Sequence, residues 1–184
     1  MTSKPFLENL KFVTGNPNKI REAQDILGFE LDHAEIDLEE IQTYDIRTAV
    51  TAKVNQAWDI LKCPVMVEDS GLIFTSWNGL PGALVKWFEK TVGCSGLLRM
   101  LKDFDDRKAF AVCMVAIHDG NEVRVAEGRV HGQISESMKG KNGFGWDVIF
   151  IPEGFSQTYA EMDPEDKNSI SHRRLAFEKI KKLL

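Results

Sequence analysis

A short loop near the N-terminus carries residues suited to holding a phosphate group. It follows an apolar run at residues 10–13 and consists of Thr14, Gly15, Asn16, Pro17, Asn18 and Lys19. Gly15 permits a tight turn, Asn16 is a good N-cap, and Pro17 suits the first position of a helix. We expect free backbone amides there, which would attract an anion together with the helix dipole and the Lys19 ammonium. An ordinary strand-turn-helix with a solvated lysine explains this loop equally well when it is taken alone.

Two adjacent acids, Glu68 and Asp69, directly follow an apolar segment at residues 65–67 that we expect to form a buried strand. They would lie at the tip of that strand and, because side chains alternate along an extended backbone, would point in different directions. An enzyme that cleaves a polyphosphate must offset negative charge and must orient or deprotonate a water, and carboxylates with Mg²⁺ meet both needs. Glu40 is a further candidate ligand, although a solvated acidic turn is the better explanation of residues 39–40 taken alone.

Glycines and aromatic rings are combined with charged residues between positions 139 and 147. Phe144 and Trp146, with Gly145 between them and Asp147 after them, could line a slot for a flat heterocycle, because nucleobases stack on such rings. The same two rings could instead be ordinary core aromatics that lead into a strand at residues 148–151. Both interpretations fit the pattern equally well.

Basic residues gather at the start of the expected last helix. Lys167 precedes His172 and Arg173, and such side chains can bind a phosphate or the carbonyl group of a base. A purine with an oxo group at position six presents an acceptor where adenine presents an amino donor, so a guanidinium would discriminate between them. His172 could equally be a capping or packing residue. Lys53 and Lys86, taken singly, are best explained as solvated lysines.

The composition argues against several classes of function. A net charge of −5 over 184 residues disfavours a sequence-independent grip on nucleic acid, which needs many lysines and arginines. Three widely spaced cysteines lack the paired spacing of zinc or redox sites and indicate reduced thiols inside a cell. Residues 1–8 do not resemble a leader, and no apolar run reaches membrane-spanning length. We therefore expect one soluble cytoplasmic domain, residues 1–184, that binds a small nucleotide and neither nucleic acid nor a membrane.

Periodicity and turn residues predict an α/β fold that would position these groups. The expected helices cover residues 17–27 closed by Gly28, 46–61 after an Asp45 cap, 84–92, 96–101, and 171–184 with Leu175, Ile180 and Leu183 inward. The expected strands cover residues 10–13, 29–37, 65–67, 109–118, 123–130 and 148–151. Asp119 and Gly120 indicate a hairpin between two of these strands, so the sheet would be mixed.

Four ordered segments resemble one protein family. They are residues 14–19, Glu68-Asp69-Ser70-Gly71, Phe144-Gly145-Trp146-Asp147 and Ser171-His172-Arg173. Together they are far more specific than any one alone, and the chain resembles the inosine triphosphate pyrophosphatase family from residue 10 to about residue 179. This family hydrolyses non-standard purine nucleoside triphosphates such as ITP, dITP and XTP. Three further segments look most like archaeal and eukaryotic members, namely Gly79-Leu80-Pro81-Gly82, Lys86-Trp87-Phe88 and residues 157–162.

The resemblance implies a long mixed central β-sheet flanked by helices, two lobes with an active-site cleft between them, and a homodimer. The substrate-binding residues that it implies are Thr14, Gly15, Asn16, Pro17, Asn18, Lys19, Lys53, Asp69, Ser70, Lys86, Phe144, Gly145, Trp146, Asp147, Lys167, His172 and Arg173. The loop at residues 14–19 and the two lysines Lys53 and Lys86 would contact the phosphates. The segment at residues 144–147 would form the base slot, and the last three residues of the set would recognise the oxo-purine. Asp69 would be catalytic and would share Mg²⁺ with Glu40, and Glu68 is a third candidate ligand.

The implied reaction is hydrolysis between the α and β phosphates, which yields a monophosphate and pyrophosphate and keeps non-canonical purines out of DNA and RNA. Two other functions stay open, namely a related pyrophosphatase for modified pyrimidine or 7-methylguanine nucleotides and a nucleotide-sensing module without turnover. A P-loop NTPase is disfavoured, because residues 15–19 lack the longer glycine-lysine-serine/threonine pattern. Many bacterial members carry two aspartates in place of Glu68-Asp69 and an arginine-containing segment in place of Lys86-Trp87-Phe88. The identity of the metal-binding carboxylates therefore also stays open.

Overall fold

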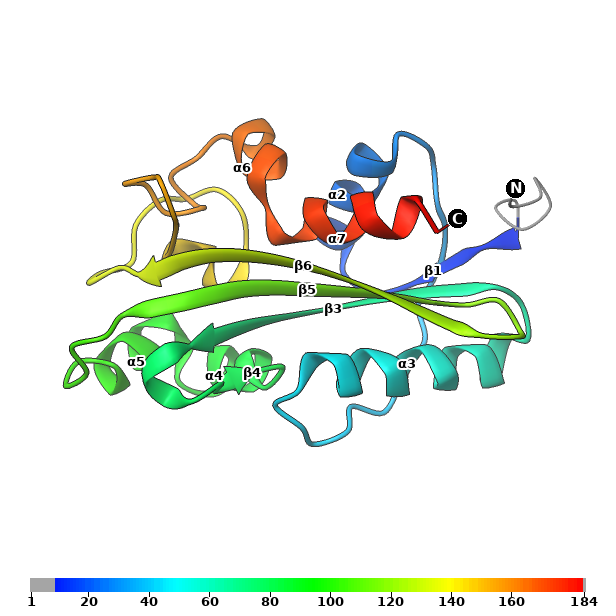
Figure 1. Ribbon diagram of the computed structural model, residues 1–184, viewed down its shortest axis with the longest axis horizontal. Coiled ribbons are helices and arrows are strands. Elements are labelled where there is room, and N and C mark those ends of the chain that lie inside the picture. The colour runs from blue at the N-terminus through cyan, green and yellow to red at the C-terminus, as the bar shows by residue number, and fades with distance from the viewer. Residues whose placement is uncertain (1–8, 184) are drawn as a thin grey trace.

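A seven-stranded sheet runs through the computed structural model, which describes residues 9–183 (Figure 1). The strands hydrogen-bond in the order β2-β1-β3-β5-β6-β7, and β4 pairs with β3 beside this path. Their bounds are β1 (Lys11–Val13), β2 (Asp32–Ala34), β3 (Val65–Phe74), β4 (Pro81–Gly82), β5 (Lys108–His118), β6 (Val123–Ile134) and β7 (Phe150–Pro152). β1 runs parallel to both of its neighbours, β2 and β3. The other four pairs are antiparallel, namely β3–β4, β3–β5, β5–β6 and β6–β7. The expected mixed sheet is confirmed.

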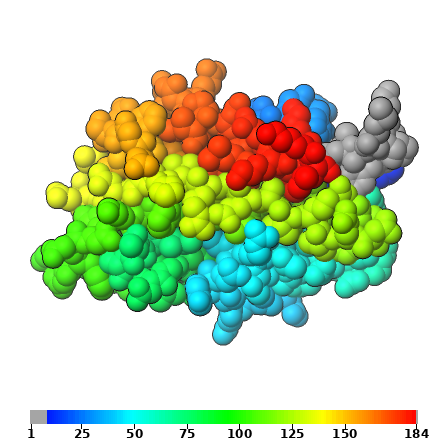
Figure 2. All heavy atoms as spheres, in the orientation of Figure 1, coloured from blue at the N-terminus to red at the C-terminus, as the bar shows by residue number. Residues whose placement is uncertain are grey.

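Helices cover both faces of this sheet (Figure 1). One face carries α2 (Pro17–Leu27), α6 (Pro164–Ile170) and α7 (His172–Lys181). The other carries α3 (Ile46–Leu61), α4 (Val85–Thr91) and α5 (Gly93–Met100). In the space-filling view, atoms of α7 in red and of α3 in cyan lie on opposite sides of the green and yellow band of β5 and β6 (Figure 2). Two short 3₁₀ turns, η1 (Thr75–Trp77) and η2 (Gly145–Val148), lie outside these helices.

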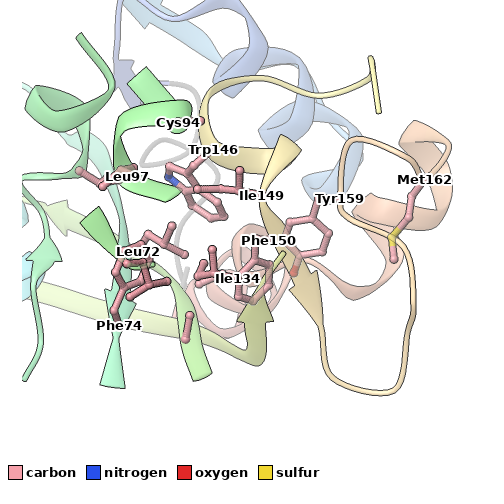
Figure 3. Close-up of a cluster of buried hydrophobic side chains, with 14 residues drawn as sticks. Leu72, Phe74, Cys94, Leu97, Ile134, Trp146, Ile149, Phe150, Tyr159 and Met162 are labelled. Atoms are coloured by element: carbon pink, nitrogen blue, oxygen red, sulfur yellow. The ribbon is translucent and has the colours of Figure 1, made fainter. Parts of the chain in front are cut away.

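Three clusters of buried apolar side chains hold the helices against the sheet. One lies under α2 and α7, where the rings of Phe12 and Phe177 pack edge to face with centroids 6.0 Å apart. A second lies under α3, where Val50 and Val54 are fully buried. The third fills the far end of the sheet (Figure 3). β3 and β5 contribute residues to all three clusters, so these two strands connect the packing along the whole sheet.

The local signals at both ends of α2 and at the start of α3 are confirmed, whereas α5 begins at Gly93 rather than at residue 96 and α6 is not among the expected helices. Asn16 caps α2 by accepting from the Asn18 amide at 2.9 Å, and the helix ends at Gly28 with φ of +78°. Asp45 caps α3 by accepting from the Thr48 amide at 2.8 Å. The expected hairpin also forms, because β5 and β6 pair antiparallel on either side of Gly120. Within residues 9–183, no helix combines the length and apolar character needed to cross a bilayer.

The strand bounds differ more from expectation than the helix bounds do. β3 continues from Val65 to Phe74, because each of its residues pairs with a residue of β5. The acids at positions 68 and 69 therefore lie within a strand, and their expected place at a strand tip is wrong. β2 covers only three of the residues expected at 29–37, and β7 begins at Phe150, because η2 occupies residues 145–148. β6 is longer than expected and continues to Ile134.

The last helix also differs in part from expectation. α7 ends at Lys181, and its buried face consists of His172, Arg173, Ala176, Phe177 and Ile180. Ile180 is inward as expected, Leu175 is partly buried, and Leu183 is 43% exposed. The inward position expected for Leu183 is therefore wrong. Residues 1–8, where a leader is not expected, and residue 184, the expected end of the helix and of the domain, lie outside the described residues.

Gly128 in β6 fixes how closely α7 can approach the sheet. A Cβ atom at this position would lie 2.4 Å from the Ala176 nitrogen and even closer to the His172 carbonyl oxygen. Both contacts are with backbone, which cannot rotate away as a side chain could. The start of α7 therefore depends on the absence of a side chain at position 128.

We expect Gly128→Ala to lower the free energy of unfolding by about 3 kcal/mol, the upper end of the usual cost of overpacking, because α7 must move away from β6. Urea unfolding followed by circular dichroism measures this loss. Gly154→Ala is the control, since Gly154 has φ of +85° but a Cβ atom there would meet no described residue within 4 Å. This change should cost only about 1–2 kcal/mol of backbone strain. Equal losses in the two variants would contradict the close packing of α7 on Gly128.

Candidate active site

A cavity of about 1020 Å³ opens where the loop after β1, the middle of β3, the helix α4, the turn η2 and the start of α7 meet. Most residues proposed from the sequence line it, namely Thr14, Gly15, Asn16, Lys19, Glu40, Lys53, Glu68, Asp69, Ser70, Lys86, Phe144, Gly145, Trp146, Asp147, His172 and Arg173. Pro17, Asn18 and Lys167 do not line it. One cavity thus brings together segments that lie far apart in the sequence.

Glu68 and Asp69 point to opposite sides of β3, as the alternation of an extended strand predicts. Glu68 is fully buried against Arg173 of α7, with Nε–Oε2 and Nη2–Oε1 distances of 2.8 Å. Asp69 faces α3, where its Oδ2 lies 2.9 Å from Nζ of Lys53. This strand therefore supplies one carboxylate to a buried ion pair and the next to the cavity wall.

Lysines and carboxylates form a compact cluster at the α3 side of the cavity. Lys53 Nζ lies 2.9 Å from Asp69 and 3.1 Å from Glu40 Oε1, and Lys86 Nζ lies 2.7 Å from the same Glu40 oxygen. Burial alone would lower the pKa of Lys53, but Asp69 and Glu40 outweigh it and raise that pKa. Burial would likewise raise the pKa of Glu40, but Lys86 and Lys53 lower it. Lys53 and Glu40 therefore keep their charges at neutral pH, and the cluster presents both ammonium and carboxylate groups to a ligand.

A second set of ion pairs is buried beneath the opposite side of the cavity. Arg173 donates to Glu68 and also, through Nη1, to Glu22 of α2. Lys167 of α6 donates to Glu22 at 3.1 Å and to Asp147 of η2 at 2.7 Å. These five side chains, which we call the buried ion network, are each less than 10% exposed. They link β3, α7, α2, α6 and η2.

Burial and pairing act against each other in the ionisation of this network. Burial would raise the pKa of Glu68, but Arg173 and Lys19 outweigh it and hold that pKa well below its ordinary value. The pKa of Asp147 is raised, because burial there exceeds the opposing effect of Lys167. The carboxylates near Arg173 raise its pKa despite its burial, so its guanidinium remains charged.

Phe144, directly before η2, and Trp146, within it, both line the cavity, and Trp146 also belongs to the core. Trp146 is only 7% exposed and packs within the cluster at the far end of the sheet, near Leu97 and Ile149, but it also lines the cavity (Figure 3). Phe144 is partly buried, and its ring centroid lies 4.9 Å from Lys167 Nζ and 5.4 Å from Arg173 Cζ. These distances are typical of cation–π contacts. Trp146 is therefore a core residue, as one of the two interpretations predicts, and it also lies beside the cavity.

His172 is a buried neutral imidazole at the wall of the cavity. Its ring centroid lies 5.2 Å from that of Trp146 and 6.0 Å from that of Tyr159. Burial, together with the positive charges of Arg173 and Lys167, lowers its pKa well below the ordinary value. Its Nδ1 is buried and has no hydrogen-bond partner among the residues that the structure describes. One ring nitrogen is therefore open to a ligand.

The loop after β1 differs from the expected cradle of free amides. The amide of Asn16 donates to Thr14 Oγ1 at 3.2 Å, and that of Asn18 donates to the Asn16 side chain at 2.9 Å. The expectation of free amides is wrong for these two groups, because side chains of the loop satisfy them locally. Lys19 lies in the first turn of α2, and its ammonium is 3.4 Å from the Glu68 carboxylate.

Residues 10–183 match the sequence model of the Ham1 family. The chain belongs to the Ham1 family. It is 47% identical over 179 residues to the inosine triphosphate pyrophosphatase of Batrachochytrium dendrobatidis, which covers 95% of this chain and 93% of that protein. It is 43% identical over 182 residues to the inosine triphosphate pyrophosphatase of Schizosaccharomyces pombe, with 97% and 96% covered. The resemblance seen in the four sequence segments is confirmed.

Solved structures of other Ham1 proteins share the fold. A HAM1 protein from Coxiella burnetii superposes with a TM-score of 0.84 at 28% identity, over 95% of this chain and 96% of that one. A nucleoside-triphosphatase, also titled dITP/XTP pyrophosphatase, from Mycobacterium abscessus gives a TM-score of 0.77 at 29% identity, over 93% and 97%. The long mixed sheet flanked by helices is therefore a feature of the Ham1 family that this chain shares.

Glu40 and Asp69 form the donor set of this Ham1 protein that best fits Mg²⁺. Their oxygens converge on a single ammonium, that of Lys53, and carboxylate oxygens are the ligands that Mg²⁺ prefers. Among the described residues, no group of three or more His, Cys, Asp and Glu side chains gathers at one point. A site with two carboxylates is nevertheless usual for Mg²⁺, because substrate phosphates and waters supply the other ligands. Glu68 fits this role less well, since both its oxygens accept from Arg173.

Several charged residues of the site were not found from the sequence. Glu22 is buried in α2 and accepts from both Arg173 and Lys167, although the helical pattern places it beside the apolar Ala23. The signal in the sequence is an acidic residue on the side of an amphipathic helix that faces the interior of the protein. Glu35 and Glu89 also line the cavity, and no local motif distinguishes them from solvated acids.

We expect Glu68→Gln to destabilise the protein by about 3–5 kcal/mol at pH 7, because it leaves the buried Arg173 charge without its main partner. Thermal or urea unfolding measures this change. Asp59→Asn is the matched control, since Asp59 forms an exposed ion pair with Lys62 whose loss should cost less than about 1 kcal/mol.

The difference in unfolding free energy between the wild type and Glu68→Gln should depend on pH, because the pKa of Glu68 is lowered in the folded protein. The ionised carboxylate stabilises the folded protein above the unfolded pKa of 4.5, and this contribution is lost as the pH falls toward the folded value. The gap in unfolding free energy between the wild type and Glu68→Gln should therefore narrow below pH 4.5. A gap that is small at pH 7 or independent of pH would contradict the strong Glu68–Arg173 pair.

Proposed function

We propose that this chain is an inosine triphosphate pyrophosphatase that hydrolyses ITP, dITP and XTP to the monophosphate and pyrophosphate. Its membership of the Ham1 family and the names of its relatives support this activity. The observation that carries it is one cavity with a cluster of lysines and carboxylates on one side and an aromatic slot with a neutral histidine on the other. A nucleoside triphosphate needs both kinds of surface, because it joins a polyanion to a flat base.

The triphosphate would bind beside Lys53 and Lys86, whose ammonium groups are held by carboxylates at the cavity wall. Lys19 would add positive charge, and the polar side chains of Thr14 and Asn16, which also line the cavity, would add contacts from the loop after β1. Glu40 and Asp69 would hold Mg²⁺, which when bound would offset the charge of the phosphates. A homodimer, which the family resemblance implies, stays a prediction.

Asp69 is our candidate for the group that activates water. Its Oδ1 accepts from the Ser70 amide at 3.1 Å, and its Oδ2 accepts from Lys53, so the carboxylate is held in one orientation. A water oxygen would attack the α-phosphorus while a carboxylate oxygen of Asp69 accepts the proton. The bond from the α-phosphorus to the bridging oxygen would break, and pyrophosphate would leave with that oxygen. Lys53 and Lys86 would offset the charge that develops on the phosphates.

The base would lie beside Phe144 and Trp146, where His172 and Arg173 can read its edge. Four hydrogen bonds engage four of the five N–H groups of Arg173, since Nε and Nη1 donate to carboxylates and Nη2 donates to Glu68 and Ser70. One N–H of Arg173 and the Nδ1 of neutral His172 are thus available for hydrogen bonds. The positive charge of Arg173 favours the oxo group of hypoxanthine or xanthine over the amino group of adenine.

We expect ITP and XTP, in the presence of Mg²⁺, to be cleaved much faster than ATP, because only the first two present an oxo group without an amino donor at the purine six position. Chromatography of the products should show the monophosphate and pyrophosphate. The panel should include GTP, 7-methyl-GTP and modified pyrimidine nucleotides, which separate the related pyrophosphatases. Release of orthophosphate alone, or equal rates on ITP and ATP, would sink the proposal.

We expect Asp69→Asn to reduce kcat for ITP by about 10²–10⁴-fold, because the amide cannot accept the proton of the attacking water. Circular dichroism should show an unchanged fold, since Lys53 keeps Glu40 as a partner. Asp59→Asn in α3 is the control and should retain wild-type turnover. Near-normal turnover of Asp69→Asn would remove this residue from its proposed role.

A further inference from the structure

Glu40 belongs to a segment between β2 and α3, residues 35–43, that has no regular secondary structure. Exposure alternates along its first part, so Ile36, Leu38 and Glu40 are partly buried and the residues between them are exposed. Ile36 and Leu38 pack against the apolar cluster under α3. Glu40 is the next residue on the same inner side, and its carboxylate binds the Lys53 ammonium. The backbone path of this segment therefore decides where the Glu40 carboxylate lies.

Gln56 of α3 holds the backbone of this segment at Glu39. The Glu39 amide donates to Gln56 Oε1 at 2.9 Å, and Gln56 Nε2 donates to the Glu39 carbonyl oxygen at 3.1 Å. A glutamine amide carries both a donor and an acceptor, so it can exchange two hydrogen bonds with one residue's backbone, as a paired strand does. Among residues 9–183, no other hydrogen bond reaches the backbone of residues 35–42. Gln56 thus supplies the pairing that a neighbouring strand would give.

The next anchor of this backbone lies beyond Glu40. The carbonyl oxygen of Tyr44 accepts from the amide of Ala83, directly after β4, at 2.9 Å. Glu40 therefore lies between two held points of the chain. Gln56 follows Lys53 by three residues in α3, so their side chains lie on the same side of that helix. This side of α3 holds the backbone of the segment through Gln56 and the carboxylate of Glu40 through Lys53.

The two bonds from Gln56 do not compete with a metal ion for carboxylate oxygens, because they go to the backbone of Glu39. Glu40 Oε1, in contrast, accepts from two lysines, and these ion pairs weaken when the same oxygen binds a cation. A ligand that stays ordered without the lysines loses less conformational entropy when the cation binds. We propose that Gln56 is a positioning residue that sets how tightly Glu40 and Asp69 hold Mg²⁺, an inference that rests on the proposed function.

The test measures, at one fixed ITP concentration, how the rate of cleavage depends on the Mg²⁺ concentration. Gln56→Met removes both bonds and adds no charge. We expect it to raise the half-saturating Mg²⁺ concentration by about tenfold and to lower the rate at saturating Mg²⁺ by less than about twofold. Asn55→Met changes an exposed neighbour of Gln56 in α3 and should match the wild type in both values.

A double variant shows whether Gln56 acts through Glu40. If it does, Gln56→Met should add less than about twofold to the half-saturating Mg²⁺ concentration of Glu40→Gln, because the ligand that Gln56 positions is already altered. Hydrogen exchange followed by NMR gives a second readout, which needs neither substrate nor metal. The Glu39 amide should exchange about fivefold faster in Gln56→Met than in the wild type, since its acceptor is lost. The same amide should be unchanged in Asn55→Met.

An unchanged Mg²⁺ dependence in Gln56→Met, an unchanged exchange rate of the Glu39 amide, or an equal effect of the change with and without Glu40 would overturn the proposal. So would a lower rate at saturating Mg²⁺ without a shift in the half-saturating concentration, which is the result of a purely structural role. If the wild type does not cleave ITP, the proposed function fails, and calorimetric titration with Mg²⁺ alone then tests Gln56 separately. In that case a weaker Mg²⁺ affinity in Gln56→Met supports the positioning role, and equal affinities overturn it.

Discussion

The buried charge of Arg173 is the constraint on which the rest of the site depends. A guanidinium that is only 2% exposed must be paired with carboxylates, because an isolated buried charge is strongly unfavourable. Glu68 and Glu22 provide these partners from β3 and α2. Glu22 then needs a second cation, which Lys167 supplies, and Lys167 in turn holds Asp147. One buried charge thus fixes the relative positions of a strand, three helices and the turn that carries the aromatic slot.

This constraint also explains why β3 serves both sides of the cavity. Its alternation places Glu68 under the side proposed to bind the base and Asp69 at the side proposed to bind the phosphates. The two carboxylates are adjacent in sequence. The buried Glu68–Arg173 pair therefore also helps to fix the position of Asp69, the residue proposed to activate water. The two sides of the cavity, which we propose to bind the base and the phosphates, are therefore held at a fixed separation by a single peptide bond and the pairing of β3 with β5.

Local signals in the sequence predicted the helices better than they predicted the strands or the site. Asn16 and Asp45 cap their helices through hydrogen bonds to residues two or three positions away. These signals are local, and α2 and α3 have the expected bounds. The length of β3 depends on pairing with residues of β5 that lie 35 to 53 positions later in the chain, and no turn residue marks its end. Glu40, Lys53 and Lys86 look individually like solvated charges, and only the family resemblance favoured a functional role for all three. Glu22 pairs with Arg173 across 151 residues, a separation that no local pattern can report.

The buried ion network determines the chemistry of a residue outside it. Arg173 and Lys167 carry the positive charges that, with burial, keep His172 neutral, and a neutral imidazole has one nitrogen that can accept a hydrogen bond and one that can donate. A protonated His172 would have only donors and would add a further buried charge beside Arg173. The proposed selection of the base therefore depends on cations that are largely occupied by their own carboxylates. Their electrostatic effect on His172 persists even though few of their N–H groups remain free for the substrate.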